Sequence, residues 1–197
     1  MYPESLRKVV ESFKLLPGIG EKTAERLAFS VLDMDPDNIE CFSENIINLN
    51  KTIKKCEKCN VLSDNDICTV CSNPSRNNDM LCIVDDSKSV FLFEKLGIFQ
   101  GRYFVLEGLI SPIDGIAPDD IGLAKLVEYI NKEDFKEVII AVKPSIEGET
   151  TALYIKKILE DLDITVSKMA SGIPMGAEIE YLDILTLERA LKDRTVM

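Results

Sequence analysis

The sequence predicts a multidomain α/β protein, with a helical N-terminal part, a small cysteine-built module and a larger half of parallel strands. Three observations predict it. Apolar residues recur at helical spacing over the first 53 positions, and four cysteines cluster over 56–71. From position 81 onward, short apolar runs alternate with helical stretches, the pattern of parallel strands joined by crossover helices. With 46% hydrophobic residues among 197, the chain can bury a substantial core.

A glycine-rich turn separates the first two predicted helices. We expect amphipathic helices over 4–15 and 21–32, and a third over 39–53. Gly18 and Gly20 permit positive φ, so the chain can turn sharply between the first two. Such a turn leaves backbone N–H groups at the start of the second helix free to bind a phosphate. The segment therefore predicts a helix–hairpin–helix.

Lys22 and Arg26 make this turn a candidate DNA-binding site. They lie four residues apart on one helix face, where both can reach the DNA backbone beside the two glycines. The alternative is an ordinary helix connection that contains two glycines. A nucleotide-binding P-loop does not fit, because that motif needs a strand before the loop and glycine directly before the lysine, where Glu21 stands.

The cysteine cluster has the spacing of a metal site. Two CxxC pairs, each able to present two thiolates to one ion, complete a four-cysteine shell for Zn²⁺: Cys56, Cys59, Cys68 and Cys71. No coordination position stays open, so the predicted zinc is structural. The alternatives are disulfides, which fit poorly with an intracellular chain, and a redox dithiol, which normally occurs once.

We also make predictions for the lysines beside the cluster and for the two remaining cysteines. Lys54, Lys55 and Lys58 are expected to offset part of the charge of the four thiolates. Cys41 and Cys82 lie in apolar stretches, and we expect both to be buried thiols in the core.

The second half of the chain alternates strands and helices. We expect strands over 81–84, 103–106, 138–142 and 164–166, helices over 87–96, 121–131 and 150–162, and a further strand and helix over 178–191. Asp85 and Asp86 follow the first strand, and the loop 143–149 follows the third. Their carboxylates are expected at the edge where α/β sheets bind ligands, a place suited to Mg²⁺.

The composition excludes several classes of protein. Apolar runs such as 138–142 are shorter than the about 20 residues of a membrane helix, and no secretory signal opens the chain, so we expect a cytoplasmic location. The net charge of −11 argues against passive adhesion to DNA. Residues 1–58, however, carry 9 Lys and Arg against 10 Asp and Glu, so DNA contacts are expected there. The absence of histidine excludes Ser-His and Cys-His nucleophile pairs.

The order of these motifs resembles the RecR family of bacterial recombination mediators over essentially the whole chain. The resemblance rests on the two CxxC pairs and on six runs: 16–29, 71–74, 101–106, 111–115, 118–122 and 172–178. It implies a helix–hairpin–helix, a four-cysteine zinc finger, a Toprim-type parallel α/β domain and a C-terminal Walker B-like strand/helix segment. The boundaries expected for these four parts, the last an oligomer contact, are 1–55, 56–71, 79–174 and 175–197.

The resemblance also implies a function and partners. Such proteins respond to DNA damage in recombinational repair and act with RecO and RecF to load RecA at gapped DNA, where single and double strands meet. They form ring-like homo-oligomers, often tetramers, and have no membrane partner. Residues matching Lys22 and Arg26 contact DNA in the family. A cytoplasmic, nucleoid-associated protein with structural Zn²⁺ is therefore expected.

The chain departs from catalytic Toprim enzymes at the residues that bind metal. Those enzymes resemble one another in a Glu after the first strand and an Asp-x-Asp after a later one, and the matching residues here are Asp85, Lys143 and Ser145. A lysine would place a positive charge where the metal belongs, so we expect a scaffold that is not an enzyme rather than a Toprim nuclease or primase. Glu147 and Glu149, with Asp85, are interpreted as a partner-binding surface, or alternatively as a solvated first helical turn. A module that docks partner proteins alone is the third hypothesis, favoured by the acidic balance.

Overall fold

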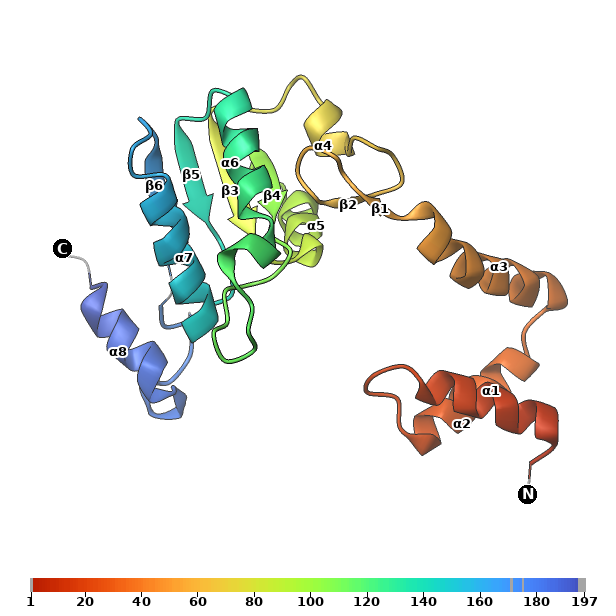
Figure 1. Ribbon diagram of the computed structural model, residues 1–197. Coiled ribbons are helices and arrows are strands. Elements are labelled where there is room, and N and C mark those ends of the chain that lie inside the picture. Colours follow the sequence, from red (N-terminus) through yellow and green to blue (C-terminus); the bar gives the residue numbers. More distant parts are fainter. Residues whose placement is uncertain (1, 171, 175, 195–197) are drawn as a thin grey trace. The chain divides into compact units, whose positions relative to one another are not determined.

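The computed structural model describes residues 2–170, 172–174 and 176–194 (Figure 1). Its internal contacts divide the chain into two units, Met1–Ile53 and Lys54–Met197, each with a hydrophobic core of its own. The first unit is helical, and the second contains both β-sheets. In the part of the chain described, no helix is both long enough and apolar enough to cross a membrane.

Three helices build the first unit: α1 (Glu4–Lys14), α2 (Glu21–Leu32) and α3 (Pro36–Thr52). Their positions confirm the three helices expected from apolar periodicity. Helices α1 and α2 pack against each other, because Val10 of α1 meets Ala24 and Ala28 of α2 in a small core. The short side chains of the two alanines let the helix backbones approach closely. The packed pair places the turn between α1 and α2 at one end of the unit.

Helix α3 has no buried residue. It begins where the Asp35 side chain accepts a hydrogen bond from the N–H of Asp37, with Pro36 in the first turn. Its apolar residues repeat at helical spacing; those from 41 to 49 are exposed, whereas Ile39 is half-buried. The prediction that Cys41 is a buried thiol is therefore wrong, because the periodicity that suggested burial belongs to a helix with an uncovered face. Cys82, by contrast, is buried as predicted.

The cysteine module opens the second unit. Its elements are short: β1 (Lys54–Lys55), β2 (Leu62–Ser63) and α4 (Thr69–Ser72). Strands β1 and β2 pair in antiparallel register, Lys54 with Ser63 and Lys55 with Leu62. All four cysteines belong to the same hydrophobic core as the larger sheet, and the N–H of Val105 donates to the carbonyl oxygen of Cys59 at 2.8 Å. The module therefore packs on the α/β part and shares its core.

Four parallel strands form the larger sheet, in the order β4-β3-β5-β6. In chain order they are β3 (Met80–Val84), β4 (Arg102–Val105), β5 (Glu137–Ile140) and β6 (Thr165–Lys168). The four strands expected over 81–84, 103–106, 138–142 and 164–166 are all present. The chain runs outward from β3 to β4 and then crosses to β5 on the other side of β3. The direction of winding therefore changes between β3 and β5, the kind of place where α/β sheets bind ligands.

Helices cover both faces of this sheet: α5 (Ser87–Leu96), α6 (Leu123–Lys132) after the 3₁₀ turn η1 (Pro118–Ile121), and α7 (Ile146–Ile158). Right-handed crossovers put α5 on one face and α6 and α7 on the other, in front of the sheet in Figure 1. Helix α5 has the predicted bounds. Helix α7 begins at Ile146 rather than at 150, because Ser145 caps it by accepting a hydrogen bond from the N–H of Gly148.

The C-terminal segment consists of the 3₁₀ turn η2 (Ile179–Tyr181) and helix α8 (Ile184–Lys192). The predicted helix is present, but the strand predicted within 178–191 is wrong for the described residues, which contain no strand there. The apolar run that suggested a strand finds no neighbouring strand to pair with. Instead, Asp183 accepts a hydrogen bond from the N–H of Thr186 at 2.9 Å and starts a helix.

Candidate functional site

The turn before α2 uses positive φ at one of its two glycines. Gly18 has a φ of +82°, which side-chain-bearing residues rarely adopt, whereas Gly20 has φ −85° and ψ 170°, an ordinary extended conformation. Gly20 therefore does not use the positive φ that glycine permits. This residue stands instead at the N-cap of α2, where no side chain caps the helix, and a Cβ there would point into open space. The backbone of the turn is accessible from outside.

The start of α2 combines free donors with exposed cations. The N–H groups of Glu21, Lys22 and Thr23 have no hydrogen-bond partner among the described residues. Lys22 and Arg26 are both exposed, and neither forms an ion pair with another described residue. Lys14, just before the turn, is held by Glu11 and Glu21 at 3.1 and 2.7 Å. The predicted glycines and cations thus lie in one turn, and its two predicted cations have no carboxylate partner within the described chain.

The four predicted zinc ligands form one buried cluster. Their Sγ atoms all lie within 4.8 Å of one another, and those of Cys59 and Cys68 are 3.6 Å apart. A hydrogen bond from Cys59 lowers the pKa of Cys56, and the pKa of Cys59 is raised because its thiol donates that bond. Four neighbouring thiols therefore do not all ionise unaided. A divalent cation stabilises every thiolate at once, and a tetrahedral set of four cysteines is typical of structural zinc.

Backbone N–H groups support two of these sulfur atoms. The N–H of Cys68 lies 3.3 Å from the Sγ of Cys56, and the N–H of Cys71 lies 3.4 Å from the Sγ of Cys68. Hydrogen bonds of this kind hold the ligating sulfurs in place and stabilise their negative charge. The geometry of the cluster thus fits a bound zinc ion.

The lysines beside the cluster have carboxylate partners. The pairs are Lys54 with Asp66, Lys55 with Glu107 at 2.6 Å, and Lys58 with Glu133 at 3.2 Å. The expectation that these lysines offset the charge of the thiolates is therefore wrong, because an acidic side chain already neutralises each of them.

The α/β part supplies two polar side chains to this cluster that the sequence reasoning missed. The Tyr129 hydroxyl, on α6, lies 3.9 Å from the Sγ of Cys71, and burial raises the pKa of Tyr129 well above its ordinary value. Arg102, at the start of β4, is buried and donates from Nη1 to the carbonyl oxygen of Cys71 at 3.4 Å. The sequence contains one signal for Arg102, because a charged arginine is unusual at the start of an otherwise apolar strand.

The residues that match the metal ligands of Toprim enzymes take part in local structure. Asp85, after β3, accepts a hydrogen bond from the backbone N–H of Lys143, after β5, at 3.4 Å. Ser145 caps α7. Gly148 packs so closely that an added Cβ would lie 1.9 Å from the carbonyl oxygen of Lys143. The four cysteines are, in the described part of the chain, the one group of three or more side chains placed to share a metal ion.

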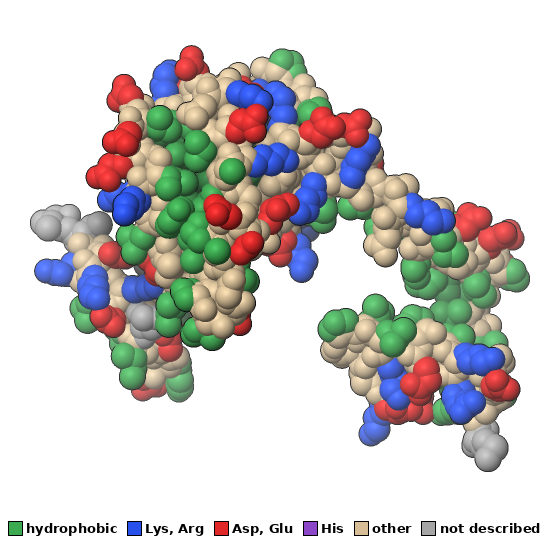
Figure 2. Space-filling view, in the orientation of Figure 1, with side chains coloured by type: hydrophobic (Ala, Val, Ile, Leu, Met, Phe, Trp, Pro, Cys, Tyr) green, Lys and Arg blue, Asp and Glu red, His purple; other side chains and the backbone are tan. Residues whose placement is uncertain are grey.

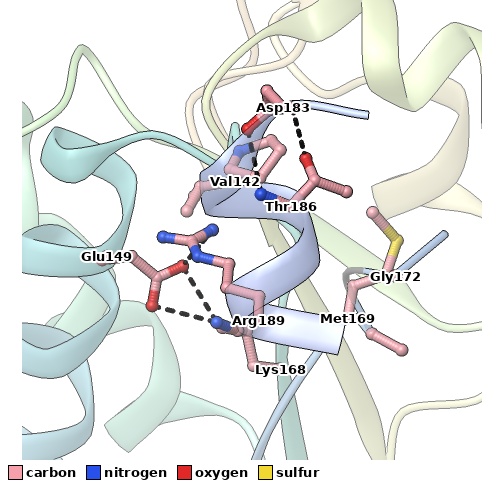
Figure 3. Close-up of a pocket in the computed structure, with 10 residues that line it drawn as sticks. Val142, Glu149, Lys168, Met169, Gly172, Asp183, Thr186 and Arg189 are labelled. Carbon is pink, nitrogen blue, oxygen red and sulfur yellow. Dashed lines mark hydrogen bonds and ion pairs between the residues drawn. The ribbon is translucent and has the colours of Figure 1, made fainter. Parts of the chain in front are cut away.

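Glu147 and Glu149 both lie in the first turn of α7. A hydrogen bond from Ser145 lowers the pKa of Glu147. Glu149 forms ion pairs with Lys168 of β6 at 2.9 Å and with Arg189 of α8 at 3.1 Å, as Figure 3 shows. These pairs line a cavity of about 340 Å³ at the carboxyl ends of β5 and β6. The carboxylate of Glu149 therefore links the C-terminal helix to the sheet.

Models of protein families match this chain in four consecutive segments. Three are models of RecR: its helix–hairpin–helix at residues 6–49, its four-cysteine zinc finger domain at 53–73 and its C-terminal part at 172–195. The fourth is the Toprim domain, at residues 79–170. Their order follows the helical turn, the cysteine cluster, the parallel sheet and the C-terminal helix described above. The cysteine cluster is thus a structural zinc finger.

Curated relatives match over the full length. Recombination protein RecR of Staphylococcus saprophyticus is 41% identical over 196 residues, which cover 100% of this chain and 99% of the relative. Recombination protein RecR of Clostridium perfringens is 44% identical over 196 residues, with 100% and 98% covered. The likeness thus includes the helical turn, the zinc finger, the sheet and the C-terminal helix together, and the chain belongs to the RecR family of recombination proteins.

Proposed function

We propose that this chain is a non-catalytic, DNA-binding mediator of recombinational repair, which acts with RecO and RecF to load RecA at gapped DNA in the cytoplasm, at the nucleoid. The observation that carries the proposal is the exposed pair Lys22 and Arg26 at the uncapped start of α2. Neither has a carboxylate partner among the described residues, although the protein as a whole is strongly acidic.

Phosphate is the group that this turn suits. Free N–H donors, the positive end of the α2 dipole and two cations on one helix face all favour an anion. Because Gly20 has no Cβ and the space beside it is open, a phosphate can approach the backbone closely there. On the face of the second unit seen in Figure 2, acidic and basic side chains are mixed rather than gathered in a broad basic patch. Contacts to phosphate do not depend on the base sequence, which suits a protein that acts at gaps of any sequence.

The alternative function, a Toprim nuclease or primase, is disfavoured by the edge of the sheet. Catalysis there needs several carboxylates around a metal ion. Asp85 is engaged by backbone, Lys143 brings a positive charge, and Ser145 is the cap of a helix. We therefore propose that the α/β domain binds other molecules and does not catalyse a reaction.

The proposal includes a homo-oligomer, a tetramer, and the exposed face of α3 supports it. Phe42, Ile46 and Leu49 recur at helical spacing and are 43%, 56% and 57% exposed. Clustered exposed apolar side chains of this kind typically mark interaction surfaces. An oligomer would also multiply weak phosphate sites along one DNA molecule, which raises the overall affinity.

The proposal assigns the partner proteins to the acidic surface formed by Asp85, Glu147 and Glu149. Both glutamates lie at the positive end of the α7 dipole, which favours carboxylates whatever their function. Glu149 forms two ion pairs inside the chain, whereas Asp85 and Glu147 form hydrogen bonds but no ion pair among the described residues, so a cationic partner would meet these two first. The Asp85→Asn/Glu147→Gln variant should therefore bind DNA normally but lose binding to RecO or RecF.

Fluorescence anisotropy on a gapped duplex tests the DNA site. The variants are Lys22→Ala/Arg26→Ala and a matched control, Lys156→Ala/Lys157→Ala, which removes two exposed positive charges from the last turn of α7. The hairpin variant should lose affinity about tenfold or more, and its dependence of log K on log salt should become shallower by about one to two, because phosphate contacts release counterions. The control should bind like wild type.

The outcomes separate the hypotheses. Equal losses in the hairpin variant and the control would contradict a phosphate site at the turn. A denaturing gel of the same samples shows whether the DNA is cut. Cleavage in the presence of Mg²⁺ would support the nuclease hypothesis. With RecO and RecF added, wild type should speed the assembly of RecA on gapped DNA, and no effect there would rule out the mediator role.

A further inference from the structure

A buried arginine lies beside the zinc finger without an acidic partner. Arg102 is 7% exposed, and its Nε donates to the side-chain oxygen of Asn78 at 2.7 Å while Nη1 donates to the carbonyl oxygen of Cys71 at 3.4 Å. Both acceptors are neutral, and none of the Asp and Glu residues that the structure describes forms an ion pair with this guanidinium. A buried charge is costly unless an opposite charge lies near it.

Arg76 shows the usual arrangement in the same unit. Its side chain is 11% exposed, pairs with the carboxylate of Glu94 and also donates to the carbonyl oxygen of Phe99. Arg102 has comparable contacts with neutral oxygens but lacks the carboxylate. The positive charge of Arg102 is therefore not balanced by an ion pair with a described Asp or Glu.

A zinc–thiolate cluster has a charge opposite in sign to that of Arg102. Four thiolates around one divalent ion leave a formal charge of about −2. The three neighbouring lysines are engaged by carboxylates, and their side chains are 43% to 56% exposed, where water screens them. Arg102 contacts the backbone of a zinc ligand from inside the core, where charges attract one another more strongly than at the surface.

Tyr129 serves the same zinc ligand. Its ring is fixed by Phe104 and Phe135, at centroid distances of 6.0 and 5.5 Å, so packing sets the position of its hydroxyl near the Sγ of Cys71. Backbone N–H groups donate to Cys56 and Cys68. Within the described part of the chain, no backbone N–H donates to the sulfur of Cys71. Because a zinc-bound thiolate has no proton to donate, the Tyr129 hydroxyl 3.9 Å away would donate to it.

We propose that Arg102 is the counter-ion of the zinc–thiolate cluster and that Tyr129 holds the Cys71 sulfur in its ligating position. Both are positioning residues, and both come from the α/β domain rather than from the zinc finger itself. The zinc site then includes side chains separated from its ligands by 31 and 58 positions in the sequence. Zinc binding and the folding of the sheet are coupled through these two residues.

Competition for zinc between the full-length protein and a metallochromic chelator tests the proposal. Arg102→Gln should lower zinc affinity about 10-fold to 100-fold, the effect typical of residues that support metal ligands. Arg102→Lys keeps the positive charge and should lose less. Tyr129→Phe removes the hydroxyl but keeps the ring, so its loss should lie at or below the low end of that range.

Arg76→Gln is the matched control, because it removes a similarly buried arginine whose charge is balanced by Glu94. It should lower the melting temperature without changing the zinc affinity of the folded protein. Cobalt substitution gives a second measurement that loss of stability alone would not change. Removing a positive charge near the thiolates should move the sulfur-to-cobalt charge-transfer band of Arg102→Gln to longer wavelength and leave that of Arg76→Gln in place.

The proposal is overturned if folded Arg102→Gln keeps wild-type zinc affinity and the wild-type cobalt band. It is also overturned if Arg76→Gln loses zinc affinity to the same extent, since the effect would then reflect stability alone. Where Arg102→Gln does not fold, Arg102→Met, which fills a similar volume without the charge, takes its place beside Tyr129→Phe. Wild-type zinc affinity in both of these variants would reject the roles of the two residues.

Discussion

The two units of this chain differ in how much of their apolar surface they bury. In the first unit, the fully buried core that the structure describes consists of Val10, Ala24 and Ala28, and α3 contributes no buried residue. In the second, one core runs from the zinc cysteines through the sheet and includes large side chains such as Tyr103 and Phe104. Burying a large apolar side chain stabilises the folded state by about 1.5–3 kcal/mol. The first unit buries few such side chains, so hydrophobic burial stabilises it little. The first unit thus leaves more of its apolar surface exposed, which fits the interaction surface proposed on α3.

The two units also differ in how their charged side chains are paired. Next to the turn of the first unit, Lys22 and Arg26 have no acidic partner in the described chain. In the second unit, lysines around the zinc finger are paired with carboxylates, and Glu149 holds two cations. The first unit therefore leaves these two positive charges unpaired among the described residues, whereas the second pairs much of its charge internally.

The largest expected effect is the loss of zinc from the second unit. Cys56→Ser/Cys59→Ser should release the metal and lower the melting temperature by roughly 10–20 °C, because structural zinc contributes several kcal/mol and a unit of this size loses about 2–4 °C per kcal/mol. The sheet should melt with the finger, since they share one core. Calorimetry and metal analysis measure this. Full metal content with an unchanged melting temperature would contradict the structural role of zinc.

A smaller effect is expected from adding one methyl group to a glycine in each unit. Gly148→Ala should destabilise the second unit by about 2–4 kcal/mol, because the new Cβ would collide with the carbonyl oxygen of Lys143. Gly20→Ala should leave stability within about 0.5 kcal/mol, since its Cβ meets open space, but should weaken DNA binding by crowding a phosphate. Urea denaturation and anisotropy measure the two effects. Similar stability losses in both variants would remove the contrast between the units.

The exposed face of α3 predicts an effect on assembly rather than on folding. Ile46→Lys should lower the mass measured by sedimentation, because it places a charge in the apolar face proposed to hold the oligomer together. Asn48→Lys is the control, with the same added charge at an exposed position off that apolar row. Unchanged mass in Ile46→Lys, or equal dissociation in both, would exclude α3 as the contact.

The smallest expected effect concerns pH. A hydrogen bond from Lys55 holds the pKa of Glu107 below its usual value, so the pair stabilises the fold above that value and loses this contribution as the pH falls through the folded pKa. Because the Glu107 side chain is 41% exposed, the contribution is under about 1 kcal/mol. Glu107→Gln should be slightly less stable than wild type at neutral pH and equally stable in acid. Urea denaturation across pH with excess zinc measures this, and a difference that grows in acid would contradict it.

Much of the fold could be predicted from local patterns. The strands were found because parallel strands buried on both faces consist of short apolar runs, and α2 and α5 because their periodicity and end signals agree. Pairing of distant residues could not be predicted in this way. The stretch after 178 reads as a strand by composition, yet it pairs with none of the strands that the structure describes, and a helix capped by Asp183 begins there instead.

By itself, the sequence determined the four cysteine ligands, the glycine turn and the cations beside it, because two knuckles and one helical turn each place their own residues together within a few positions. The tertiary structure alone decided that Arg102 and Tyr129 lie at the zinc ligands, that Glu149 joins α7 to α8, and that α3 stays uncovered. The physical reason is the range of the forces involved. Spacing and periodicity act along the chain, whereas burial and charge pairing depend on which distant segments the folded core brings together.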